Sequence, residues 1–212
     1  MGKEISTVRT LLHIPIIHTQ ADMGALREPI RQLTIEKLGK EGWERNVKSA
    51  DQMWEAIRQV IEKWELPYEQ VRLYQDGLPN CGREVEIVTQ LAQAGSPNHM
   101  LLVELMQKGA TLMGTESPDL LLQEYQLIQQ TLARRDGGRA SGREGGLARL
   151  SRSLLEKRDR YIAARVSETL GRGETGIIFL GLLHSLERLV APDIRLQYPL
   201  GRPAPRGKAG AS

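Results

Sequence analysis

The sequence predicts an α/β protein with a single domain, in which a mainly parallel sheet is flanked by helices. Short apolar runs alternate along the chain with longer segments of helical periodicity. Two runs, 11–17 and 176–180, are almost continuously apolar, as strands buried on both faces of a parallel sheet are. With 212 residues and 40% apolar content, the chain is long enough for one well-buried domain.

The first strand and two helices are predicted before residue 65. The strand at 11–17 is followed by a polar turn and then by a helix, which Gly39 and Gly42 are expected to break. Ser49 or Asp51 can cap the next helix, in which apolar residues recur with helical spacing. The tryptophans of this helix are expected to pack in the core.

The rest of the chain continues the alternation of strands and helices. Two helix starts are marked by Ser-Pro pairs, Ser96-Pro97 and Ser117-Pro118, in which serine is the N-cap and proline occupies the first turn. The predicted strands are 71–74, 110–113, 176–180 and 194–198, and the predicted helices are 84–94, 97–109, 118–132 and 147–170.

Composition sets the expected limits of the domain. Residues 1–200 are predicted to form it, and the Pro/Gly/Ala-rich segment 201–212 is predicted to be a disordered tail. Segment 134–146 is rich in glycine and arginine and has no apolar periodicity, which predicts a mobile surface loop. The arginines of this loop either contact an anionic ligand or are simply solvated.

Several classes of protein are disfavoured. The net charge of +3 equals the three basic residues of segment 201–212, so the body is close to neutral and nucleic-acid binding is not expected. No apolar run approaches the roughly 20 residues that span a bilayer. The only cysteine of the sequence, Cys81, cannot form an intramolecular disulfide, which favours a location in the reducing cytoplasm. We interpret it as an ordinary thiol in a loop. Nucleotide-binding and serine-hydrolase motifs are absent from the sequence.

Polar groups that follow buried strands are the candidate functional residues. His18 and His184 each end an apolar run, and Asp76 and Glu116 occupy comparable positions. The carboxyl ends of parallel strands meet at one edge of the sheet, which is where ligands bind. Two imidazoles with one or two carboxylates are a ligand set for zinc, manganese or iron. We therefore predict a divalent-metal site formed by His18, His184 and Glu116.

Each of these residues also has a structural interpretation. A lone histidine at a strand end often only satisfies local hydrogen bonds. Glu116 is favoured near a helix N-terminus by the helix dipole, and Asp76 suits the turn before Gly77. Of the remaining histidines, His13 is expected to pack or hydrogen-bond within its strand. His99, in the first turn of a helix, is expected to be exposed.

Arg158 and Asp159 lie in a helix with charges of alternating sign. Such a pattern normally marks a solvated helix face. Alternatively, Arg158 points inward and holds an anion or a carboxylate in the fork geometry of its guanidinium group.

This helix and the strand that follows it resemble a known group. Arg158-Asp159, the strand 176–180 and Gly181-Leu182-Leu183-His184 are similar to the C-terminal half of the TraB/Tiki-like superfamily, which also includes erythromycin-esterase-like and ChaN-like proteins. Members carry a second Gly-x-x-His near the N-terminus. At the matching position, Pro15-Ile16-Ile17-His18, the histidine agrees and the glycine is replaced by proline. The resemblance implies a metal-dependent protease or a haem-binding protein, with Glu116 or else Asp76 as the acidic residue.

Three functions follow as hypotheses. The first is a metal-dependent hydrolase acting on a small-molecule or peptide substrate, with Glu116, Arg158 and Asp76 as catalytic residues next to the metal. The second is a non-catalytic α/β module that binds a small anionic ligand or haem in the same cleft. The third is a regulatory protein whose arginine-rich loop and basic tail contact an acidic partner. A homo-oligomer is compatible with each.

Overall fold

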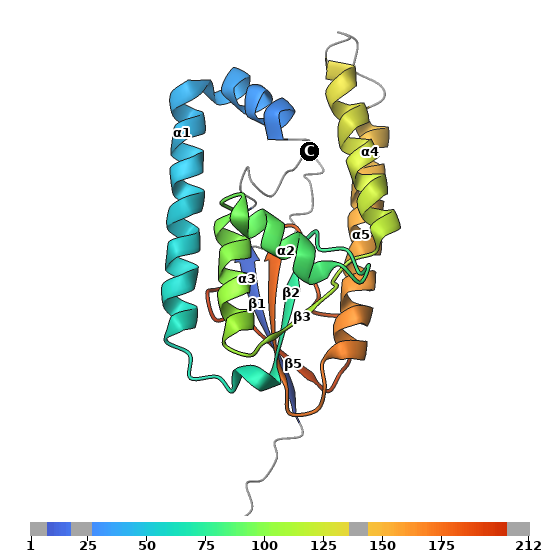
Figure 1. Cartoon of the computed structure of the whole chain (residues 1–212). Coiled ribbons are helices and arrows are strands. Elements are labelled where there is room, and N and C mark those ends of the chain that lie inside the picture. Colours follow the sequence, from blue (N-terminus) through green and yellow to red (C-terminus); the bar gives the residue numbers. More distant parts are fainter. Residues whose placement is uncertain (1–7, 18–26, 136–143, 203–212) are drawn as a thin grey trace, which may run out of the picture.

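The computed structural model describes residues 8–17, 27–135 and 144–202, which form a five-stranded sheet with helices on both faces (Figure 1). The strands are β1 (Arg9–Ile16), β2 (Val71–Gln75), β3 (Thr111–Met113), β4 (Thr175–Gly181) and β5 (Ile194–Gln197). The helices are α1 (Arg27–Glu62), α2 (Glu84–Gln93), α3 (Pro97–Gln107), α4 (Pro118–Arg135) and α5 (Glu144–Thr169), with a 3-10 turn η2 (Tyr68–Gln70).

All strand pairs in the sheet are parallel, and the strand order is β3-β2-β4-β1-β5. The predicted α/β class with a mainly parallel sheet is therefore confirmed. The five predicted strands agree with the observed ones to within two residues at each end. β4 lies at the centre between β1 and β2, which explains its continuous apolar sequence: five consecutive residues, Gly176 to Leu180, are buried.

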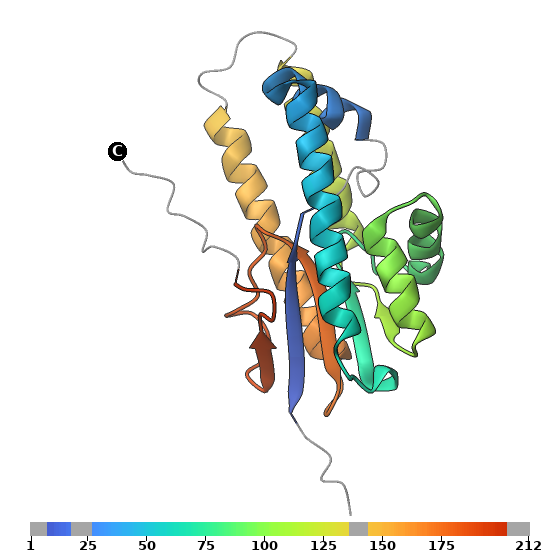
Figure 2. The ribbon, with the colours of Figure 1, turned by 90° about the vertical axis from the view of Figure 1, so that its left-hand side faces the viewer.

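Alternate residues of each strand pack against different helical layers. One core contains Leu12, Ile177 and Phe179 together with residues of α1, α2 and α3. The other contains Leu11 and Ile178 together with residues of α5. α4 packs on α5, so α4 and α5 lie together on one side of the sheet and α1 on the other (Figures 1 and 2). The period of two along a strand produces this division.

The tryptophan prediction for α1 is confirmed. Trp54 is buried, and its ring lies 5.9 Å from that of Phe179 on β4. Burial of a side chain of this size contributes about 1.5–3 kcal/mol to stability. This contact fixes the C-terminal half of α1 to the centre of the sheet.

The predicted break near Gly39 is a kink within α1. Gly39 has a positive φ of 72°, and the chain resumes a helix immediately afterwards. Gly42 does not end the helix; a Cβ there would lie 2.7 Å from Cβ of Leu38, so glycine permits the close approach across the kink. The prediction that Ser49 or Asp51 caps a separate helix is wrong, because both lie inside α1.

Two other predictions need correction, one in the bounds of a segment and one in its secondary structure. The glycine-rich segment 134–146 is shorter than predicted, because α4 reaches Arg135 and α5 begins at Glu144. The sequence also predicts a short helical turn after His184, with Leu186, Leu189 and Val190 as its apolar residues; this prediction is wrong, because the segment contains hydrogen-bonded turns and no helix. Residues 136–143 of the glycine-rich segment and residues 203–212 of the predicted tail lie outside the described residues.

Among the described residues, no helix combines the length and the apolar character needed to cross a membrane.

Gly114, the residue directly after β3, is expected to tolerate no side chain. A Cβ there would lie 2.5 Å from Cα of Asn80, and a backbone atom cannot move aside as a side chain can. Gly114→Ala is therefore expected to lower the free energy of unfolding by about 1–3 kcal/mol in urea titrations. Gly146→Ala is the control, because its Cβ would meet nothing within 4 Å and alanine favours helix α5. Equal stability of the two variants would contradict the close packing at Gly114.

Candidate functional site

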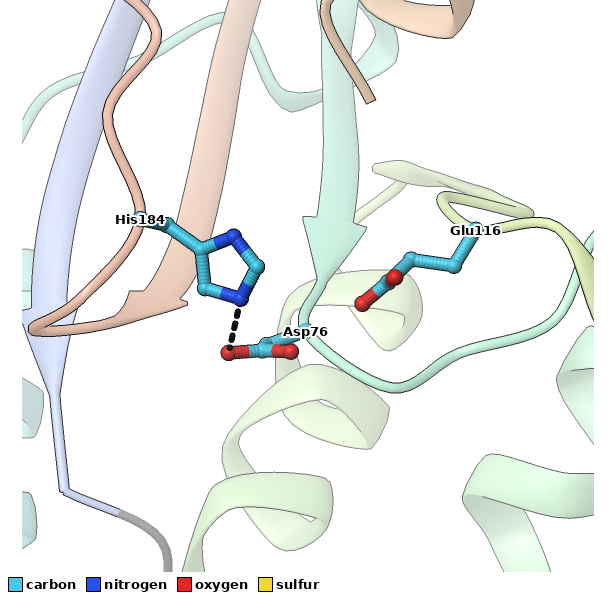
Figure 3. Close-up of side chains that lie close together, drawn as sticks. All are labelled: Asp76, Glu116 and His184. Carbon is cyan, nitrogen blue, oxygen red and sulfur yellow. Dashed lines mark ion pairs between the residues drawn. The ribbon is translucent and has the colours of Figure 1, made fainter. Parts of the chain in front are cut away.

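Three neighbouring strands deliver acidic and imidazole groups to one edge of the sheet. Asp76 follows β2, Glu116 lies three residues beyond β3, and His184 lies three residues beyond β4 (Figure 3). These strands are adjacent and parallel in the order β3-β2-β4, so their carboxyl ends meet. All three side chains are buried, and one candidate ligand atom from each lies within 4.8 Å of the others.

Asp76 is held in place by both backbone and side-chain donors. Its Oδ2 accepts a hydrogen bond of 2.8 Å from the backbone N–H of Gly181, at the end of β4. Its Oδ1 accepts one of 2.8 Å from Nη2 of Arg158. Nε2 of His184 lies 3.4 Å from Oδ2, as the dashed line in Figure 3 marks. Asp76 therefore connects β2 with β4 and α5, which is more than the alternative of a simple turn residue required.

Glu116 is fully buried and is held just as firmly. Its backbone pairs with the turn after β2, since Asn80 N–H donates to its carbonyl and its own N–H donates to Leu78. The carboxylate accepts hydrogen bonds from the Gly77 N–H at 2.8 Å and, in bidentate geometry, from Arg158 at 2.6 Å for both oxygens. Burial raises the pKa of Glu116, the Arg158 guanidinium opposes this, and the charge of Asp76 adds to it.

Arg158 points inward from α5 and holds three carboxylates. Besides Asp76 and Glu116, it forms an ion pair with Glu124 of α4. Burial alone would lower the pKa of Arg158, but these carboxylates outweigh it and raise the pKa above its ordinary value. Of the two interpretations of the helix, the structure agrees with the inward one, in which the fork of the guanidinium holds carboxylates.

Asp159 orients His184. Its Oδ1 lies 2.6 Å from Nδ1 of the imidazole, and its Oδ2 accepts a hydrogen bond of 3.3 Å from the Ser185 N–H. Burial alone would lower the pKa of His184. The charge of Asp76 and the hydrogen bonds to Asp159 and Asp76 outweigh burial and raise the pKa to about 10. Without a bound metal, His184 is therefore an imidazolium near neutral pH.

The raised pKa of His184 predicts a pH dependence of stability. A histidine whose folded pKa exceeds its unfolded value of about 6.5 stabilises the fold fully below that value. This contribution is lost as the pH rises from about 6.5 through the folded value of about 10. In thermal melts of metal-free protein, wild type should lose stability across this range and His184→Gln should lose less. Parallel curves, or an imidazole that titrates near 6.5 by NMR, would contradict the ion-pair geometry.

Asp159 and Glu124 were not predicted as site residues, although each has a signal in the sequence. Neighbouring residues on a helix point about 100° apart, so Arg158 faces the ends of β2 and β3 while Asp159 faces the turn after β4. Glu124 is an acid within the stripe formed by Leu121 and Ile128, spaced at i+3 and i+4. An acid in an apolar stripe of a helix is unfavourable unless it has a partner.

The groups around Arg158 form what we call the acidic cluster. Four carboxylates face two basic groups in it, so negative charge is in excess among its members when all are ionised. The carboxylates are Asp76, Glu116, Glu124 and Asp159, and the basic groups are Arg158 and His184.

A cavity of about 550 Å³ opens next to the acidic cluster. It lies at the carboxyl edge of the sheet, between the first turns of α1, the helices α2 to α5, and the turn after β4. Its polar lining residues are Gln75, Asp76, His99, Glu124, Arg158 and His184. Its apolar lining residues are Ile16, Ile17, Ile30, Leu78, Ile87, Leu91, Leu121, Ile128, Leu155, Leu182 and Leu183, with Tyr125, Gly77 and Gly181 completing the wall.

The prediction for His99 is wrong. Its side chain is buried, its Nδ1 lies 2.7 Å from Oγ of the N-cap residue Ser96, and it lines the cavity. The N-terminus of α3 faces the cavity, so the first-turn position that we expected in solvent is turned inward.

His13 packs inside the sheet layer, as predicted. It is fully buried on the α5 side of β1, with its ring 5.0 Å from that of Tyr198. Its two ring nitrogens have no hydrogen-bond partner among the described residues. Burial and, secondarily, the charge of His184 lower its pKa to about 4, so His13 is neutral.

The predicted ligand set is only partly represented at the site. His184 and Glu116 are brought together, and Asp76 completes the group that the described residues form. His18 lies outside the described residues, so its predicted role as a ligand is not tested. The expectation of a metal site is supported to this extent: a buried group with suitable ligand atoms exists.

No family model, curated protein or solved structure matches the chain.

Proposed function

We propose that the protein is a metal-dependent hydrolase acting on a small-molecule or peptide substrate. The observation that supports this most is the convergence of Asp76, Glu116 and His184 at one buried point beside a cavity. In this proposal the three residues hold one divalent ion, zinc, manganese or iron, and Asp159 orients His184.

The chemistry of these residues fits such an ion. Two carboxylates and one imidazole are ligands that zinc, manganese and iron accept. A metal-ligating imidazole normally donates its other N–H to a carboxylate, and Nδ1 of His184 lies 2.6 Å from Asp159. The opposite nitrogen, Nε2, faces Asp76 at 3.4 Å. A metal would replace the proton on Nε2, because only the neutral imidazole nitrogen is a ligand.

Arg158 is the feature that fits a metal least well, since its guanidinium repels a nearby cation. It donates to Asp76 and Glu116, the same carboxylates that the proposal uses as ligands. However, a carboxylate has about four lone-pair sites and accepts more than one partner. The excess of negative charge in the acidic cluster also favours an added cation. We therefore assign Arg158 the task of positioning the carboxylates.

The proposed ion would supply the nucleophile, because coordination lowers the pKa of water to about 7. The residues of the chain would supply the remaining functions. Glu124, whose side chain is 36% exposed, lines the cavity next to Arg158 and in this proposal would carry a proton between water and the leaving group. The apolar wall would exclude bulk water from the reacting groups.

The excess negative charge of the acidic cluster does not favour the alternatives based on an anion. Arg158, the residue expected to hold an anionic ligand, already holds three carboxylates. Haem carries carboxylates of its own, so the same repulsion applies to it. The regulatory alternative depends on a loop and a tail that lie mostly outside the described residues.

The expected location in the cytoplasm is likewise a proposal. It is supported by the single cysteine of the sequence, Cys81, which is exposed and unpaired as a thiol.

Removal and return of metal tests the proposed activity. Hydrolysis of a chromogenic butyrate ester should fall to background after chelation and recover when zinc or manganese is added. Asp76→Asn should stay inactive in the presence of either ion. The control is Asp119→Asn, the same change at an exposed position in the first turn of α4. Activity that survives both chelation and Asp76→Asn would exclude the proposed mechanism.

A further inference from the structure

The composition of the cavity wall suggests which substrates the site accepts. Eleven of the twenty residues that line the cavity are leucine or isoleucine, contributed by β1, α1, α2, α4, α5 and the turns after β2 and β4. Three of them, Ile17, Leu182 and Leu183, are about half exposed or more, so part of the apolar lining is in contact with water. Covering such surface with an apolar ligand is favourable by roughly 25 cal/mol per Å².

Apart from Gln75, His99 and Tyr125, the polar side chains that line the cavity belong to the acidic cluster. Asp76, Glu124, Arg158 and His184 belong to both the cavity lining and the acidic cluster. A ligand with an apolar body must therefore place its polar end here, where negative charge is in excess. An anionic end would be repelled, and a single bound divalent ion would leave this excess reduced but not reversed.

We infer that the substrate is an uncharged ester or amide of an aliphatic acid, with its acyl chain along the leucine and isoleucine wall and its carbonyl group at the acidic cluster. This inference rests on the proposed hydrolase function. The oxygen of water forms a new bond to the carbonyl carbon, and the bond from that carbon to the leaving oxygen or nitrogen breaks. The leaving group takes one proton of the water, and the acid product releases the other. Repulsion between the carboxylate product and the acidic cluster favours its departure.

Ligand selectivity can be measured apart from catalysis. In calorimetric titrations of chelator-treated protein at about pH 7, octanamide should bind at least about tenfold more tightly than octanoate, which is ionised at this pH. The two ligands share one chain, so the difference reports the head group. Equal affinities, tighter binding of octanoate, or no binding of octanamide would overturn the inference.

A matched pair of variants on α4 tests the position of the chain. Leu121 lines the cavity, whereas the adjacent Leu122 is 55% exposed and does not. Leu121→Gln should weaken octanamide binding by at least about tenfold, and Leu122→Gln by less than about twofold. Thermal melts of both variants verify that they are folded. Equal losses in the two variants would overturn the placement of the acyl chain.

The two proposals can fail separately. If octanamide binds selectively but no metal binds, the proposed metal-dependent hydrolase is contradicted, and the proposed class of ligand is still supported. If metal binds but octanamide shows no preference over octanoate, the metal site remains and the substrate class is wrong.

Discussion

Arg158→Met should lower the free energy of unfolding by about 3–5 kcal/mol, because it leaves three carboxylates without their shared cation. Two of them, Asp76 and Glu116, are almost completely buried, so water cannot replace the lost hydrogen bonds. Methionine fills most of the space of the arginine stem, so the loss reports charge and hydrogen bonding more than volume. An effect of this size is a large part of the roughly 5–15 kcal/mol that stabilises most domains.

Urea titrations with two further variants make this prediction specific. Arg165→Met, on the same helix, is the control: the hydrogen bonds of Arg165 to Gly114, Asn80 and Glu168 are 3.3–3.5 Å long, and its change should cost less than about 1 kcal/mol. The double variant Arg158→Met/Glu116→Gln should recover part of the lost free energy of unfolding, because it removes one of the carboxylates that Arg158→Met leaves without a cation. Equal small losses for Arg158→Met and Arg165→Met would show that the guanidinium is not what holds the acidic cluster together.

The pair of His184 and Asp159 should control metal affinity in a graded way. His184→Ala removes a proposed ligand and should weaken metal binding by about 100-fold or more. Asp159→Asn keeps the ligand and removes only the group that orients it, so a loss of roughly 10–100-fold is expected. The reason is geometric, since Nδ1 of His184 and Oδ1 of Asp159 lie 2.6 Å apart. Calorimetric titration with zinc and with manganese gives the affinities.

A control in the same connection between β4 and β5 separates the loss of a ligand from general damage to the fold. Glu187 lies three residues beyond His184, is exposed, and bonds to Tyr198 and Arg202. Glu187→Ala should leave the metal affinity unchanged within about twofold. Thermal melts of all three variants show whether an affinity change follows a loss of folded protein. If Glu187→Ala weakens binding as much as His184→Ala does, the connection and not the imidazole is responsible.

The strands and part of the site could be predicted because their signals are local. A short apolar run identifies a buried strand, and in a parallel sheet the run also fixes where the carboxyl end lies. Asp76, Glu116 and His184 could be predicted as site residues in this way, since each follows a strand directly or within three residues. That they belong to adjacent strands depends on the order β3-β2-β4, which the sequence does not specify.

Among the helical contributions, the sequence predicted Arg158 only as one of two alternatives and did not predict Asp159 or Glu124, because a helix face is assigned only when its packing partner is known. The charges around Arg158 and Asp159 have the pattern of a solvated surface, yet both side chains are buried because α5 packs against the ends of β2, β3 and β4. His99 shows the same effect at the start of α3, where the first turn faces the cavity. Helical periodicity identifies the apolar stripe of a helix, but tertiary packing decides which polar residues of the helix are buried.

Metal titration with a count of released protons tests the central claim most directly. Without metal, His184 is protonated up to a pH of about 10, and a metal must displace that proton to bind Nε2. We therefore expect the chain to bind one zinc or manganese ion at about pH 8 and to release at least about one proton, because ionisation of metal-bound water adds to the proton lost by His184. Calorimetry in two buffers of different ionisation enthalpy measures the number of protons released. In His184→Ala the binding should weaken strongly. No binding by wild type, or binding without proton release that His184→Ala retains, would contradict a metal site formed by Asp76, Glu116 and His184.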